Sequence, residues 1–236
     1  MKHKILAALA MVFVVAASSC SYDTVDENKA GLLLEDGKVS EEITDAARVN
    51  TFSFAHDVRL VKYDTGVFDS TFTNVAGEGD RQGDDSIRVN TSDKAQPSAN
   101  VNVSAQFDKS QMRCLFKAGI RGPKDFRDKV LRGETRAATQ VYAAMVTAPE
   151  FATKRKGEIA TAALAYLQQR FGEPIPKKDS PKGETEDAIS YAIRTLHPTS
   201  QLPETLACGT NIIRFQITDV NLPAEQQTQL NAIIKA

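Results

Sequence analysis

Cysteine and histidine are scarce in this sequence, and neither sign of charge dominates. Three cysteines and three histidines occur among 236 residues, with 29 lysines and arginines against 30 aspartates and glutamates. A balance this close to neutral implies no basic face for nucleic acid, and we expect no nucleic-acid partner. The segment from Gly31 to Gly37 lacks the phosphate-cradling spacing and the lysine-serine ending of a nucleotide-binding loop.

Long hydrophobic runs are also lacking. The apolar run at the start, from Ile5 to Ala17, has thirteen residues without charge or proline and follows Lys2 and Lys4. A helix of that length rises about 20 Å, short of the roughly 30 Å hydrocarbon core of a bilayer. The pattern is typical of an export signal, and we predict that residues 1–19 are a signal peptide outside the fold.

Cys20 stands where the apolar run ends. The sequence Ala17-Ser18-Ser19-Cys20 resembles a bacterial lipobox, with alanine at the position where leucine is usual. The resemblance implies that the Cys20 thiol is acylated and that cleavage makes it the N-terminus of a lipoprotein anchored on the extracytoplasmic, periplasmic face. An ordinary secretory signal or an uncleaved short anchor is the alternative interpretation.

The chain from Cys20 onward is large enough for one sizeable core or two small ones. It carries 27 lysines and arginines against 30 aspartates and glutamates, a formal charge of −3. Two further cysteines remain, Cys114 and Cys208. In an exported chain this pair is either a disulfide or two buried free thiols, and the sequence leaves both open.

The first half of the chain shows the period-two pattern of strands. A short apolar run, residues 31–35, is closed by the turn pair Asp36-Gly37. Alternation predicts a strand over 52–61, carried by Phe52, Phe54, His56, Val58 and Leu60, and another over 101–107. Residues 77–86 read as an exposed loop between strands.

The second half shows helical periodicity before a returning strand. Apolar residues recur from Phe126 and Val130 through Ala137, Val141 and Met145, and a second stripe runs from Pro149 to Phe171. Three prolines within residues 172–183 predict a surface loop, followed by a short helix over 188–196. Ile213, Phe215 and Ile217 alternate in a last strand, after which a short helix follows. Strands, helices and a returning strand predict an α+β fold.

These segments, taken in order, resemble the SPFH (band 7, prohibitin-like) domain of stomatins, prohibitins and flotillins. The resemblance rests on GLLLEDGKV, FSFAHDVRLVKYD, VNVSAQFD, the helix pair bearing Arg136 and Arg155, and NIIRFQITDVNLP. It implies a mostly antiparallel sheet packed by amphipathic helices over residues 20–223. Residues 172–210 are an insertion relative to the family, and residues 224–236 form a short C-terminal helix in place of the family's long coiled coil.

The resemblance implies a non-enzymatic, membrane-anchored scaffold that organises or regulates membrane proteins and needs no cofactor. Its expected partners are the lipid bilayer through acylated Cys20, further copies of the chain, and an integral membrane protein. The alternative is an extracytoplasmic binding lipoprotein that uses the 172–210 insertion. A cysteine hydrolase built from Cys114 or Cys208 with His56 or His197 is a weaker third hypothesis.

Three groups of residues are candidate sites. The apolar stripe of the terminal helix, Leu230, Ile233 and Ile234, is a candidate oligomer contact. The run Lys154-Arg155-Lys156 is a candidate contact for anionic headgroups, with a solvated helix face as the alternative. The acidic residues Glu78, Asp80, Asp84 and Asp85 fit no metal-binding loop, and we interpret them as a solvated turn.

Overall fold

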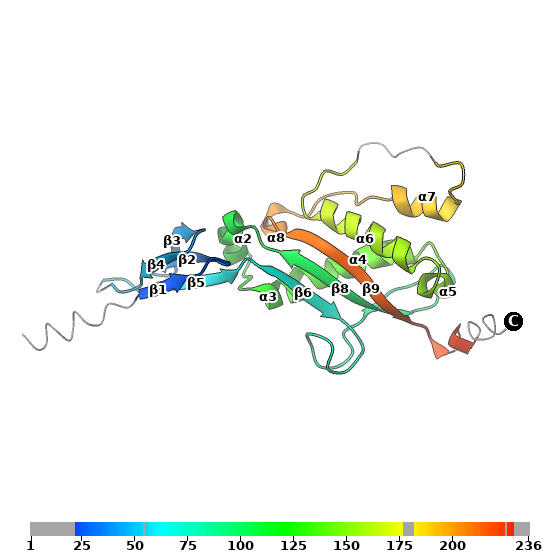
Figure 1. Cartoon of the computed structure of the whole chain (residues 1–236), viewed down its shortest axis with the longest axis horizontal. Coiled ribbons are helices and arrows are strands. Elements are labelled where there is room, and N and C mark those ends of the chain that lie inside the picture. Colours follow the sequence, from blue (N-terminus) through cyan, green and yellow to red (C-terminus); the bar gives the residue numbers. More distant parts are fainter. Residues whose placement is uncertain (1–21, 54, 177–181, 225, 229–236) are drawn as a thin grey trace, which may run out of the picture. The chain divides into compact units, whose positions relative to one another are not determined.

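The described residues form two compact units, which are divided between Gly66 and Val67 (Figure 1). The structure is a computed structural model, which describes residues 22–53, 55–176, 182–224 and 226–228. Antiparallel sheets and several helices together confirm the α+β prediction. Among the described residues, no helix combines the length and the hydrophobicity needed to cross a membrane.

The first unit consists of two small antiparallel sheets. One pairs β1 (Tyr22–Val25) with β4 (Ala47–Asn50), and the other has the order β3 (Lys38–Ile43), β2 (Lys29–Glu35), β5 (Val58–Asp64). Asp36 and Gly37 join β2 to β3 with φ of 50° and 78°, as a two-residue hairpin turn requires. The strand and turn predicted over 31–37 are confirmed.

A small apolar core lies between these strands. Val25, Leu33, Ile43 and Val49 are buried, and Val58 and Leu60 pack against them. Gly31 allows the strands to approach, because a Cβ there would lie 2.8 Å from Val25 Cγ2 and 2.9 Å from Leu60 Cδ1. A larger residue at that position would push the core apart.

The strand predicted over 52–61 begins only at Val58, and the first part of that prediction is wrong. Ser53 Oγ accepts hydrogen bonds from the backbone N–H groups of Ala55 and His56, at 3.2 and 3.1 Å. Asp36 Oδ1 accepts one from the N–H of Asp57 at 3.0 Å. Polar side chains therefore satisfy this backbone locally, which competes with a sheet ladder. Phe54 lies outside the described residues.

The sheet of the second unit is centred on β8 (Ser98–Gln106). It pairs antiparallel with β6 (Val67–Phe72) and the short β7 (Ile87–Arg88), and along its other edge with β9 (Asn211–Asn221). Most of β8 is buried, including Val101 and Val103. The strand predicted over 101–107 is therefore confirmed as the centre of the core.

Two irregularities change the phase of β9. Its register against β8 shifts between Arg214 and Ile212 and again between Asp219 and Ile217. An extra residue in a strand reverses which face the following side chains occupy. Ile212, Phe215, Ile217 and Val220 are consequently buried, whereas Ile213, expected on the inner face, is exposed.

Helices cover one face of this sheet. The first stretch joins α3 (Pro123–Phe126), the π-helical η2 (Arg127–Leu131) and α4 (Arg132–Ala143) without a break. The wider π turn shifts the helical phase, so the buried residues of α4 are Thr135, Ala138, Thr139, Tyr142 and Ala143. The stripe predicted at Ala137, Val141 and Met145 is therefore wrong, and Ala137 is exposed.

The second long helix lies between the sheet and the insertion. After α5 (Ala148–Ala152), α6 (Lys156–Arg170) packs against both β9 and α4. Its inner face buries Ile159, Ala163 and Leu167. Within the insertion, α7 (Ala188–Thr195) packs on α6, and α8 (Glu204–Ala207) leads back to β9 (Figure 1). The short helix predicted over 188–196 is confirmed.

The chain leaves the sheet through Leu222-Pro223 and begins a helical turn. The N–H groups of Gln226 and Gln227 both donate to the Pro223 carbonyl at 3.0 Å. The remainder of the predicted terminal helix, with Leu230, Ile233 and Ile234, lies outside the described residues, as does Cys20.

Candidate functional site

The 172–210 insertion is fastened to α6 by a buried arginine. The guanidinium of Arg155 donates from Nη2 to Asp187 at 2.7 Å, and from Nη1 to Glu158 at 2.8 Å and Ser190 Oγ at 2.6 Å. Only 5% of Arg155 is exposed. A buried guanidinium needs paired acceptors, and two of the three come from the start of α7.

Asp187 has a second role as the N-cap of α7. Its Oδ1 accepts hydrogen bonds from the backbone N–H groups of Ile189 and Ser190, at 3.0 and 2.9 Å. The hydrogen bond from Ser190 N and the Arg155 guanidinium together lower the pKa of Asp187 to about 2. One carboxylate thus begins the helix of the insertion and ties it to α6.

Arg155 therefore does not face lipid, and the headgroup contact predicted at Lys154-Arg155-Lys156 is wrong for its central residue. The side chain turns inward at the start of α6, where α7 supplies its acceptors. Lys156 Nζ donates to the Thr218 carbonyl at 3.2 Å, and Lys154 is exposed. The run does not act as one basic face, because its three side chains have different environments.

The far end of α7 is attached as well. The Tyr142 hydroxyl donates to the Leu196 carbonyl at 2.7 Å, and His197 Nδ1 lies 3.1 Å from Gln169 Oε1. Arg170 Nη1 donates to the Ser200 carbonyl at 2.6 Å, and its own carbonyl accepts from Leu202 N at 2.7 Å. Both ends of α7 are thus held on α4 and α6.

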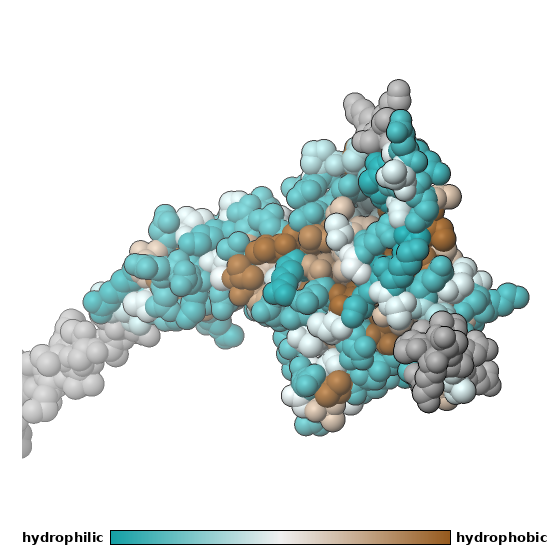
Figure 2. Space-filling view, turned by 45° about the vertical axis from the view of Figure 1, so that its right-hand side comes forward, coloured by the Kyte–Doolittle hydropathy of each residue, from teal (hydrophilic) through white to brown (hydrophobic). Residues whose placement is uncertain are grey.

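A pocket of about 360 Å³ lies between α6 and α7. Its wall is mostly apolar and includes Ala162, Ala165, Ile193 and Leu196, with the Tyr142 ring in the lining. Polar groups at the same site are Glu158, Thr161, Glu186, Ser190, Arg194 and His197. On the face shown in Figure 2, brown apolar residues of the second unit lie among teal hydrophilic ones. The insertion therefore creates a concave site that α6 alone would not have.

The charges beside this pocket are compensated within the chain. Glu186 accepts from Arg194 Nε and Nη2 at 2.9 Å, and this pairing lowers the pKa of Glu186 to about 2. Glu158 is paired with Arg155. Burial raises the pKa of Tyr142, so its hydroxyl stays a neutral donor. An apolar wall with neutralised charges suits a small, mainly uncharged apolar group.

The sequence predicts a solvated turn for the acidic loop, residues 77–86, and the structure corrects this interpretation for Asp85. Asp85 is buried and pairs with Arg127 and Arg132 of the π-helical stretch and α4. Arg127 lies with its guanidinium carbon 4.8 Å from the centroid of Phe72, and its Nε is 3.0 Å from Asp80 Oδ2. Neighbouring Asp84 stays at the surface with Arg88. Loop and helix are joined here by charge.

No group of three or more histidine, cysteine, aspartate or glutamate side chains in the described part of the chain is arranged to hold a metal ion. The acidic loop turns Asp85 toward arginines instead. His56 Nδ1 lies 2.8 Å from Asp36 Oδ2, where the first hairpin turns.

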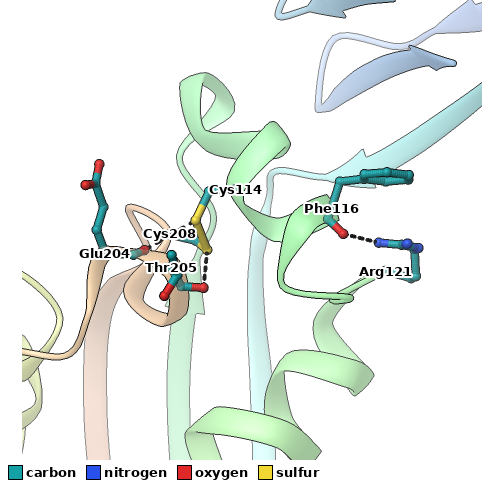
Figure 3. Close-up of a disulfide and its surroundings, with 6 residues drawn as sticks. All are labelled: Cys114, Phe116, Arg121, Glu204, Thr205 and Cys208. Atoms are coloured by element: carbon teal, nitrogen blue, oxygen red, sulfur yellow. Dashed lines mark hydrogen bonds between the residues drawn. A yellow bond between two sulfur atoms is a disulfide. The ribbon is translucent and has the colours of Figure 1, made fainter. Parts of the chain in front are cut away.

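Cys114 and Cys208 are joined in a disulfide (Figure 3). Cys114 lies on α2 (Met112–Lys117), and Cys208 follows α8 in a left-handed conformation, with the two Cα atoms 5.4 Å apart. That separation is typical of disulfides. The bond ties the return of the insertion to α2. Neither sulfur is a free thiolate, the nucleophile that a cysteine hydrolase needs.

The model of the SPFH domain / Band 7 family matches residues 23–236, almost the whole described chain. The protein therefore belongs to the SPFH / band 7 family, whose members are generally membrane-associated, non-enzymatic scaffolds. No curated protein matches the sequence.

Sequence reasoning missed the residues that hold the insertion. Asp187, directly before an apolar-periodic helix, carried a recognisable N-cap signal. Nothing in the sequence indicated that Arg155 would reach it across 32 residues, or that Tyr142 would bond to Leu196. Those contacts depend on α7 folding back over α6.

Proposed function

We propose that this protein is a lipid-anchored, non-enzymatic scaffold that organises or regulates membrane proteins from the extracytoplasmic face. The observation that carries the proposal is the SPFH match over residues 23–236, which begins three residues after the lipobox-like Cys20. A family domain of membrane-associated scaffolds would thus follow its anchor almost directly.

Anchoring supports scaffolding for a physical reason. Two acyl chains on one residue give stable membrane attachment, whereas one chain is marginal. Copies held on one bilayer meet at a high effective concentration, so modest lateral contacts act together. The candidate for such a contact remains the apolar stripe of Leu230, Ile233 and Ile234.

Two measurements test the scaffold. The mature protein should partition with membranes, lack residues 1–19 and carry acyl mass on Cys20, whereas Cys20→Ser should leave it soluble or unprocessed. Crosslinking in native membranes should trap homo-oligomers together with an integral membrane protein. An unmodified Cys20 thiol would exclude the lipid anchor, and monomers without a membrane-protein partner would exclude the scaffold.

The pocket between α6 and α7 favours a second candidate, an extracytoplasmic binding lipoprotein. Its volume of about 360 Å³ and its largely apolar wall are formed with the insertion. The uncharged fluorescent probe N-phenyl-1-naphthylamine should bind there, and Ala162→Phe should weaken binding at least about tenfold by filling the pocket. Ala144→Phe, at an exposed position at the end of α4, is the matched control. Equal binding by all three proteins would reject this candidate.

A further inference from the structure

Positive charge is concentrated in one short stretch of a chain that is otherwise acidic. Residues 109–132 contain eight lysines and arginines and two aspartates, so this stretch carries +6 in a chain of net charge −1. The excess is invisible in the overall composition, because the remaining residues carry −7. It covers α2, α3 and the start of α4.

The cations of this stretch differ in their exposure. Arg127 and Arg132 pair with Asp85, and Asp128 pairs with Arg127 and Arg81. Five of the other six cations are exposed, and we call them the α2–α3 basic surface: Arg113, Lys117, Arg121, Lys124 and Lys129. The other aspartate of the stretch, Asp125, accepts a hydrogen bond from the backbone N–H of Arg121 at 2.9 Å.

Contacts of Arg121 and Lys129 bring both residues to the turn after α2. Arg113 and Lys117 are four residues apart on α2 and so share one face. The Arg121 guanidinium carbon lies 4.0 Å from the ring centroid of Phe116, and Nη1 donates to the Phe116 carbonyl at 2.8 Å (Figure 3). Lys129 Nζ donates to the carbonyl of Gly119 in the same turn. Arg121 and Lys129 thus meet at the turn that follows Arg113 and Lys117 on α2.

The surface has a fixed support. Met112 and Leu115 of α2 are fully buried, and Cys114 joins the helix to Cys208 through the disulfide. A helix of six residues is marginal by itself, so burial and the covalent bond hold it in place. The basic residues are therefore presented by a constrained element.

We propose that the α2–α3 basic surface binds the headgroups of anionic phospholipids. Exposed cations on two short elements suit a laterally mobile layer of negative charge, which can adjust to them without a shaped cavity. The proposal rests on the proposed function in one respect: a Cys20 anchor would hold each copy of the protein at a bilayer. It also moves the headgroup contact away from residues 154–156, where Arg155 is buried.

Vesicle cosedimentation tests the proposal without the anchor. The mature chain carrying Cys20→Ser should bind vesicles of phosphatidylcholine with 30% phosphatidylglycerol and leave pure phosphatidylcholine vesicles unbound. Because each surface cation strengthens binding about fivefold, Lys117→Gln with Arg121→Gln should weaken it about 25-fold. Binding should fall as salt is raised, since screening shortens the range of these charges.

A matched control removes the same charge elsewhere. Lys154→Gln with Lys182→Gln neutralises two exposed lysines outside the surface and should change binding less than about twofold. Lys117→Gln alone, at the exposed end of α2, serves if the Arg121 change perturbs folding, and should weaken binding about fivefold.

Three outcomes would overturn the proposal. The protein could show no preference for phosphatidylglycerol vesicles, or the control and surface variants could lose binding equally. In the third outcome, the surface variant binds vesicles as the parent protein does but no longer binds an acidic protein partner in native membranes, so that the surface serves that protein instead of lipid. Crosslinking of the anchored protein is scored separately, so a failure here leaves the scaffold proposal standing.

Discussion

Individual charged residues in this protein are often turned inward, where they join segments that are distant in sequence. Arg155 connects α6 to Asp187 of the insertion, and Asp85 connects a loop to Arg127 and Arg132. A buried charge is stable only with its partners, so each such residue makes its neighbours depend on it. Their neighbours Lys154 and Asp84 are exposed, and Asp84 pairs with Arg88 at the surface.

Asp85→Asn should lower the free energy of unfolding by about 3–5 kcal/mol, because it leaves the buried Arg127 guanidinium without its main carboxylate. Only 3% of the Arg127 side chain is exposed. Urea denaturation followed by circular dichroism measures the loss. Asp84→Asn removes the adjacent surface pair with Arg88 and should cost at most about 1 kcal/mol. Similar losses in both variants would contradict a special role for Asp85.

At the scale of elements, the insertion is an outer layer attached by side chains to α4 and α6. Two carboxylates of the insertion have lowered pKa values: Asp187, which pairs with Arg155 and so attaches α7 to α6, and Glu186, which pairs with Arg194 within the insertion. A carboxyl group whose pKa falls on folding stabilises the folded state above its unfolded pKa and loses that effect as the pH drops.

A fall in pH should therefore loosen the packing of α7 before it opens the sheet. The pKa values of Asp187 and Glu186 are about 2 in the fold, against ordinary values of 3.8 and 4.5. Their contribution should be complete above about pH 4.5 and disappear as the pH falls toward 2. Hydrogen exchange of the α7 amides, corrected for intrinsic rates, should show the change. In Asp187→Asn these amides should already exchange faster at pH 7, and an acid response as large as that of the wild type would count against this mechanism.

The disulfide should be the strongest single fastening between elements. It closes a segment of 94 residues in sequence, and a loop of that length contributes about 4.7 kcal/mol in the chain-entropy model. Dithiothreitol should lower the free energy of unfolding by that amount. The variant Cys114→Ala with Cys208→Ala should have a lower free energy of unfolding without reductant, and dithiothreitol should not change it further. Free alkylation of both cysteines in the folded, oxidised protein would refute the bond.

At the scale of the whole molecule, the proposed scaffold function depends on how many copies meet on a membrane. The SPFH family is generally one of membrane-associated scaffolds. The proposed assembly needs a contact surface, and the candidate is the apolar stripe of Leu230, Ile233 and Ile234, which lies outside the described residues.

Leu230→Asp with Ile234→Asp should weaken assembly without unfolding the SPFH domain, because charges on an apolar contact must be desolvated when two copies meet. Crosslinking yield in native membranes and the thermal midpoint of the purified protein measure the two effects. Gln227→Asp with Asn231→Asp adds the same charge at polar positions with the same spacing. An equal decrease in both variants would show that net charge, rather than the apolar stripe, controls assembly.

The sequence by itself determined the α+β class, the family, the turn at Asp36-Gly37, the central strand β8 and the helix α7. Each of these depends on local propensity or on the period of apolar residues, which neighbours in sequence are enough to express. The same reasoning failed where one residue changed the phase. The π turn at Arg127–Leu131 and the irregularities of β9 moved buried positions by one residue.

Only the tertiary structure decided which charges are buried, which cysteines pair and where a pocket forms. Arg155 and Lys154 are adjacent in sequence, yet one lies inside an ion pair and the other in solvent. The difference depends on α7 returning over α6, a contact between residues more than thirty positions apart. Local sequence fixes what a residue is able to bond with, whereas the choice among partners is made when distant segments pack together and exclude water.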